Sequence, residues 1–186
     1  SIDTAPLSSG ALWSQPVTEA LFNHNATYFM WVRAQDLAGN QQTSFAVGAS
    51  SIVFNFDNAQ PVSSFTSLTN YAFYNKSVGA LTGTASDEGE SGRVQVSSYS
   101  IKQTSPELWW GGSDFDSGSE LFFWLNNVGG GVWSTGTMVS KLADGKTYAV
   151  RFRSVDLAGN VESLKSMTSF YFDLSTPTTR VELPAN

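Results

Sequence analysis

Three acidic side chains stand within four positions of one another, at Asp87, Glu88 and Glu90. Carboxylate oxygens are the ligands that Ca²⁺ prefers, and the ion takes about six to eight of them. The sequence around them contains neither an EF-hand loop nor a nonapeptide calcium repeat. Asp87, Glu88 and Glu90 are therefore candidates for a calcium site, although a solvated acidic loop without an ion is the favoured interpretation.

A second group of residues is aromatic, comprising Trp109, Trp110 and Phe115. Adjacent residues of a strand face opposite sides, so one tryptophan is expected in the core and the other at the surface. An exposed platform of such rings could stack on the rings of a glycan. Packing against the protein is the favoured alternative, because aromatic side chains are mostly packing anchors.

The residue types that carry catalysis are sparse. The chain has a single histidine, His24, in an Asn-His-Asn context with no evident partner in the sequence. No serine lies in a nucleophile elbow, and no glycine-rich phosphate loop is present. We therefore expect no enzymatic activity and no cofactor.

Composition narrows the set of partners. The net charge is −6 and charged residues make up only 14% of the chain, so the clustered Lys and Arg of a nucleic-acid or anionic-lipid surface are not expected. There is no cysteine, which excludes disulfides and thiolate metal sites. No apolar run reaches the length of a membrane span, so membrane insertion is not expected.

An internal repeat is the strongest signal in the sequence. The pentapeptide Asp-Leu-Ala-Gly-Asn occurs at residues 36–40 and again at 156–160, an offset of 156 − 36 = 120. The same offset pairs Trp13 with Trp133, Ser14 with Ser134, Thr27 with Thr147 and Tyr28 with Tyr148. Phe54 and Asp57 match Phe170 and Asp173 at an offset of 170 − 54 = 116. The sequence therefore predicts a repeat of about 116–120 residues, a normal domain length.

This repeat divides the chain into three parts. Residues 1–57 are the C-terminal half of one copy, residues 58–173 a complete copy, and residues 174–186 a linker and the first strand of a further copy. Either the chain is a fragment of a longer protein, or a neighbouring chain supplies the missing strands. The fragment is favoured, because the tail after Asp173 is too short to replace those strands.

The segments between turn signals are typical of β-strands. Residues 148–154 alternate, with Tyr148, Val150, Phe152 and Ser154 on one face and Ala149, Arg151 and Arg153 on a solvated face. Further strands are expected at 81–85, 94–101, 122–125, 132–138 and 170–172, with Phe65 beginning the set and Trp133 in the core. About seven short strands separated by turns predict an all-β sandwich.

In the complete copy, a Leu-Thr-Gly-Thr-Ala strand at 81–85, a Trp-Trp-Gly-Gly-Ser segment at 109–113 and the turn at 156–160 follow in order. In this they resemble the immunoglobulin-like repeats of large bacterial surface and secreted proteins, except that the family more often has one tryptophan after a tyrosine. The resemblance implies an immunoglobulin-like β-sandwich that acts outside the cell as a stalk, spacer or adhesive module.

Such sandwiches place structural residues at fixed points. Tyr28 and Tyr148 stand where a corner tyrosine bonds back to the backbone. Asp36 with Asn40, and Asp156 with Asn160, begin and end the two hairpin turns, where the aspartate accepts turn amides. In the complete copy, Gly159 or Asn160 is expected to take the positive φ that the turn needs.

The first copy differs from the complete one on its outer face. If Tyr28 faces inward, Phe29 and Trp31 face outward, where the complete copy has Ala149 and Arg151. Two outward aromatics indicate a surface that packs against another domain or subunit. The function expected from the sequence is thus a structural or adhesive extracellular module whose partners are the repeats or subunits that complete residues 1–57. The alternative is a carbohydrate-binding module with a glycan partner.

Overall fold

The computed structural model describes residues 14, 16–76, 78–88, 93–129, 131–135, 141–163 and 167–182. These described residues form an all-β structure with one short 3₁₀ turn, η1 (Glu19–Leu21). It separates into a first unit, Ser1–Phe56, and a second unit, Asp57–Asn186. Within these described ranges, no helix has the length and apolar character needed to cross a bilayer.

The first unit is built on one antiparallel strand pair, β1 (Ala26–Trp31) with β2 (Ser51–Phe56), here called the N-terminal hairpin. On one face, aromatic rings pack with centroids 4.8–5.7 Å apart; they belong to Phe22, Tyr28, Phe54 and Phe56. Within residues 16–56, no further strand joins this pair.

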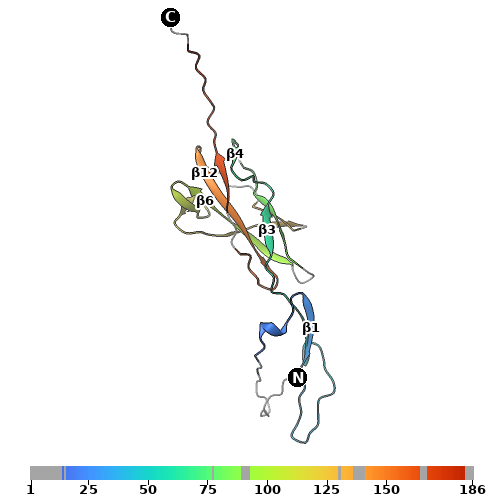
Figure 1. Cartoon of the computed structure of the whole chain (residues 1–186). Coiled ribbons are helices and arrows are strands. Elements are labelled where there is room, and N and C mark those ends of the chain that lie inside the picture. Colours follow the sequence, from blue (N-terminus) through green and yellow to red (C-terminus); the bar gives the residue numbers. More distant parts are fainter. Residues whose placement is uncertain are drawn as a thin grey trace. The chain divides into compact units, whose positions relative to one another are not determined.

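The second unit contains two sheets (Figure 1). The smaller sheet has the order β10 (Asn126–Gly129), β11 (Val132–Ser134), β5 (Thr82–Ser86), β3 (Val62–Phe65). The larger sheet has the order β4 (Ala72–Tyr74), β13 (Thr168–Phe172), β12 (Lys146–Asp156), β6 (Val94–Thr104), β7 (Glu107–Trp110), β8 (Phe115–Ser117). β9 (Phe123–Trp124) pairs with β6, and every pair is antiparallel except β13 with β4. We call β12 with β13 the C-terminal hairpin.

The core of the second unit lies between these sheets. Phe65 from β3 and Phe152 from β12 meet across the two layers, with ring centroids 4.0 Å apart. Gly83 in β5 makes room for this contact, since a Cβ there would lie 1.8 Å from the Phe152 ring. The buried apolar residues that pack together in this core are Leu81, Ala85, Tyr99, Ile101, Phe115, Leu125, Trp133, Tyr148, Val150, Phe152, Phe170 and Phe172.

The strand at 148–154 differs from expectation on its outer face. Ala149 is only 4% exposed, and Arg151 and Arg153 are half-buried, so this face is not solvated. Glu120 contacts Arg151, and the Arg153 guanidinium lies 4.0 Å from the centre of the Phe122 ring. The solvated-face prediction was wrong because the segment around residues 120–122 folds back over the sheet.

The other expected strands have counterparts in β3, β5, β6, β9, β11 and β13. The strand expected at 132–138 ends at Ser134, and residues 136–140 lie outside the described residues. Strands β4, β8 and β10 were not expected from the sequence, and β7 was expected only as the strand that carries Trp109 and Trp110. They have three or four residues each, which is too short for alternation to be recognised.

Candidate functional site

The two Asp-Leu-Ala-Gly-Asn turns share the hydrogen bonds between their aspartate and their asparagine. In the first turn, the backbone and side-chain amides of Asn40 donate to the two carboxylate oxygens of Asp36, each at 2.8 Å. In the second, Asn160 donates to Asp156 in the same way at 2.8 Å. The glycine before each asparagine has a positive φ, 89° and 92°. The pentapeptide therefore determines this turn locally, in both units.

The two corner tyrosines also match. The backbone N–H of Asn23 donates to the Tyr28 hydroxyl at 2.6 Å, and that of Ala143 donates to the Tyr148 hydroxyl at 2.8 Å. Burial raises the pKa of Tyr148, whose side chain has no exposed surface. Each hydroxyl fixes the segment five residues before it against the hairpin that follows.

The strand registers correspond pair by pair. Tyr28 lies opposite Phe54, and Tyr148 lies opposite Phe170. The neighbouring pairs follow at the offsets of the sequence repeat: Ala26–Phe56 with Lys146–Phe172, Thr27–Asn55 with Thr147–Tyr171, Phe29–Val53 with Ala149–Ser169, and Met30–Ile52 with Val150–Thr168. The N-terminal hairpin is thus matched by the C-terminal hairpin over five consecutive pairs.

The two hairpins differ in what surrounds them. In the second unit, β6 pairs with the other edge of β12, and β4 pairs with the other edge of β13. In the first unit, Phe29 and Trp31 are 55% and 57% exposed, with ring centroids 5.5 Å apart. Met30, on the opposite face, is also exposed. Both faces of the N-terminal hairpin therefore present apolar side chains to solvent.

A cluster of carboxylates forms at one end of the second unit. One oxygen from each of Asp57, Asp87 and Asp156 lies within 4.8 Å of the others. Asp57 and Asp156 are buried, and the Asn160 side chain links them by donating to the Asp57 carbonyl and the Asp156 carboxylate. We call Asp57, Asp87 and Asp156 the carboxylate cluster.

Three negative charges at this distance in the carboxylate cluster repel one another. Burial raises the pKa of Asp87; the backbone N–H of Glu88 opposes this rise, and the negative charges of Asp57 and Asp156 add to it. A proton on Asp87 or a bound cation reduces the repulsion among such carboxylates. The three oxygens that lie close together, one from each carboxylate, are fewer than the roughly six to eight ligands that Ca²⁺ takes, so the cluster alone does not define a calcium site.

The expected calcium ligands are only partly brought together. Asp87 belongs to the carboxylate cluster, whereas Glu88 is exposed and donates its backbone N–H to Asp87. Glu90 lies outside the described residues. The sequence did not indicate that Asp57 and Asp156 would join Asp87, because the three are separated by 30 and 69 residues (87 − 57 and 156 − 87).

A buried glutamate, Glu162, connects the first strand of the second unit to the end of its C-terminal turn. Its carboxylate accepts the Ser63 backbone N–H at 2.8 Å, the Ser63 hydroxyl at 2.5 Å and the Ser154 backbone N–H at 3.1 Å. Its counterpart in the first unit is Gln42 (162 − 120), which accepts the Ala34 backbone N–H at 3.4 Å. Glu162 was not predicted as a structural residue, because nothing in the sequence shows that it is buried.

The expected aromatic platform is largely packed. Phe115 is 9% exposed and contacts Tyr148, so it packs in the core, in line with the favoured alternative and not with an exposed platform. Trp110 is half-buried, with its ring edge-on to Phe115 at 5.3 Å. Trp109 is half-buried with the Lys102 ammonium 5.3 Å above its ring. These three rings therefore do not form one open stacking surface.

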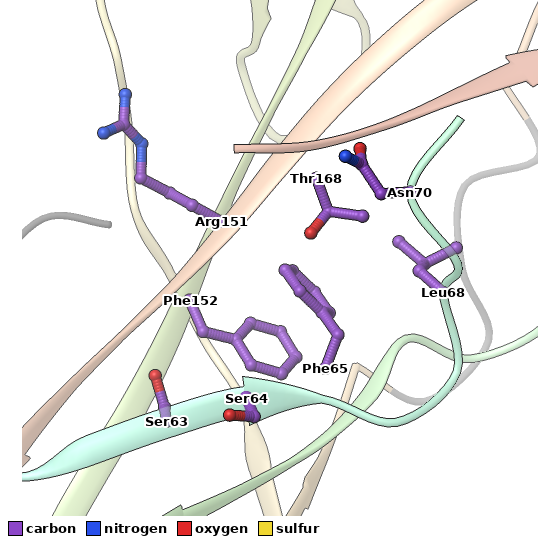
Figure 2. Close-up of a pocket in the computed structure, with 8 residues that line it drawn as sticks. All are labelled: Ser63, Ser64, Phe65, Leu68, Asn70, Arg151, Phe152 and Thr168. Carbon is purple, nitrogen blue, oxygen red and sulfur yellow. The ribbon is translucent and has the colours of Figure 1, made fainter. Parts of the chain in front are cut away.

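A cavity of about 340 Å³ lies between β3 and the C-terminal hairpin (Figure 2). Its lining residues are Ser63, Ser64, Phe65, Leu68, Asn70, Arg151, Phe152 and Thr168. Figure 2 shows the Phe65 and Phe152 rings side by side, with the Arg151 guanidinium directed away from them. Arg151 is the only ionisable residue of this lining, and its Nε lies 2.8 Å from a Glu120 oxygen. The lining thus offers no pair of groups suited to acid–base catalysis.

Comparison with known proteins does not add a family to these observations. No protein-family model matches the sequence, and no curated protein matches it either.

Proposed function

We propose that this chain is a non-catalytic structural or adhesive module, made of immunoglobulin-like β-sandwich units in series and located outside the cell or on its surface. The observation that carries the proposal is the recurrence of one hairpin. The same register, corner tyrosine and turn occur in both units, 116–120 residues apart in the sequence. A chain that repeats a scaffold without repeating a reactive site fits a role in spacing or assembly.

The strand order supports the immunoglobulin-like part of the proposal. One layer runs β3-β5-β11-β10 and the other contains β13-β12-β6. In chain order these strands correspond to A-B-E-D and G-F-C, the two layers of an immunoglobulin sandwich. The chain crosses from one layer to the other between β3 and β4. β4 then pairs in parallel with β13 in the second layer. The location outside the cell rests on the sequence resemblance.

Mechanical unfolding of the whole chain, held at its two termini, tests this proposal. A sandwich unit that spaces or links other domains resists extension through its strand ladders. We expect one force peak followed by an extension that stays below about 420 Å, the contour length of the 173 − 57 + 1 = 117 residues 57–173 at about 3.6 Å each, by the distance between the two ends of the folded unit. Extension of these residues without a force peak would contradict a structural role.

A further inference from the structure

The outer face of the C-terminal hairpin is closed by an ion pair. The Arg151 guanidinium lies 2.8 Å from a Glu120 oxygen, and the Ser100 hydroxyl donates to the same carboxylate at 2.5 Å. Ser100 and Ala149 are buried beneath this contact. The segment that carries Glu120 therefore covers this face with a polar, charged contact.

The matching face of the N-terminal hairpin has different chemistry. Phe29 stands at the position of Ala149 (29 + 120) and Trp31 at the position of Arg151 (31 + 120). Val53, which is 50% exposed, stands at the position of Ser169 (53 + 116). An indole cannot pair with a carboxylate as Arg151 pairs with Glu120. A segment that covers this face buries apolar surface instead.

We infer that the N-terminal hairpin receives the first half of a β-sandwich unit from the polypeptide that precedes it in the same chain. In this arrangement a strand pairs with β1 as β6 pairs with β12, and the covering segment has an apolar residue where the second unit has Glu120. The inference rests on the proposed series of sandwich units. A covalently preceding source is favoured because the offset of 120 continues toward the N-terminus through Ser14 and Trp13.

The register of β6 on β12 defines the partner strand. Lys102, Ile101 and Ser100 lie opposite Ala149, Val150 and Arg151. The partner strand therefore places its equivalents of these residues opposite Phe29, Met30 and Trp31. The residue opposite Met30 is apolar and faces inward, since Val150 and Ile101 are both fully buried in the second unit. Met30, 46% exposed, lacks this cover among the described residues.

An extended chain tests the inference directly. A copy of residues 58–132 replaces residues 1–12, so that it joins Trp13 as residue 132 joins Trp133 in the second unit. Hydrogen exchange of the β1 amides that do not bond to β2 is compared with that in the original chain. We expect exchange to slow by at least about tenfold, at every protein concentration.

Two engineered changes test the register and the apolar cover. The chain has no cysteine, so Trp31→Cys combined with Ser100→Cys in the added copy reports one disulfide. This disulfide should form readily, whereas Trp31→Cys with Lys102→Cys, displaced by two residues, should not.

Glu120→Leu in the added copy should raise the thermal midpoint of the completed unit. In the second unit, the same substitution should lower the midpoint, because it removes the partner of Arg151.

Three outcomes would overturn the inference. They are unchanged β1 exchange in the extended chain, preferential cross-linking in the displaced register, and protection of β1 in the original chain that rises with concentration. The last outcome would assign the face to a second copy. A midpoint unaffected by Glu120→Leu in the added copy would overturn the apolar cover. None of these results alters the force peak of residues 57–173, so failure here is distinct from failure of the proposed function.

Discussion

The N-terminal and C-terminal hairpins share their backbone pattern and differ in what covers them. Tyr28 and Tyr148 accept equivalent amides, and Asp36 and Asp156 hold equivalent turns. Yet Tyr148 and Asp156 have no exposed surface, whereas Asp36 is exposed. Local sequence thus determines the hairpin, and strands distant in the sequence determine its burial. The same side chain should therefore contribute differently to stability in each unit.

The largest difference is expected at Glu162 and its counterpart Gln42. Glu162→Ala leaves the buried backbone N–H groups of Ser63 and Ser154 without their charged acceptor, and should destabilise the second unit by about 3 kcal/mol. Gln42→Ala, the matched control, should change stability by less than about 0.5 kcal/mol. Urea unfolding of the two variants measures both values, and equal effects would show that Glu162 does not anchor the first strand.

A residue exchange between the hairpins tests the covered outer face. Ala149→Phe introduces the side chain of Phe29 at a position that is 4% exposed, and should destabilise the second unit by about 2 kcal/mol through overpacking. Phe29→Ala, the reverse exchange, should leave the stability of the first unit within about 0.5 kcal/mol. Thermal unfolding of the two variants is the measurement. A well-tolerated Ala149→Phe would mean that the segment at 120–122 does not cover this face.

The corner tyrosines provide a smaller contrast. Tyr148→Phe removes the hydroxyl that accepts the Ala143 N–H and should cost about 1 kcal/mol, because a partly buried hydrogen bond of a fully buried tyrosine is lost. Tyr28→Phe makes the same chemical change where water can replace the hydroxyl. Denaturant midpoints of each unit should therefore shift only for Tyr148→Phe, and a larger shift for Tyr28→Phe would reverse the comparison.

The aspartates should show opposite pH dependence. The pKa of Asp87 is raised by burial and by the charges of Asp57 and Asp156, so its contribution to stability is present at low pH and lost as pH rises through the folded pKa. Asp87→Asn should therefore stabilise the second unit at pH 7, by under about 1 kcal/mol, and lose this advantage below the usual pKa of 3.8.

Asp36 is the control for this pH dependence. Hydrogen bonds from the side chain and backbone of Asn40 lower its pKa, so its contribution is present above pH 3.8 and lost as pH falls. Asp36→Asn should then weaken the first unit at pH 7. Urea midpoints at pH 3 and pH 7 measure both variants, and a stabilising Asp36→Asn at pH 7 would contradict the turn geometry.

The sequence was most informative where structure is local. The repeat offsets of 120 and 116 correspond to the strand registers, because a turn and its two flanking strands form from neighbouring residues. The carboxylate cluster was not predicted, because its members come from three separate segments. The covered outer face was also missed, since Ala149, Arg151 and Arg153 have the pattern of a solvated face until the segment around Glu120 folds over them.

Native-state hydrogen exchange on the unmodified chain tests the central claim most directly, namely that residues 16–56 form the second half of a sandwich without its first half. In one experiment it compares amides of β1 and β2 with the matched amides of β12 and β13. Amides of the C-terminal hairpin should exchange only on global unfolding, at least about 1,000-fold more slowly than their N-terminal counterparts. Equal protection at the five matched pairs would contradict the account.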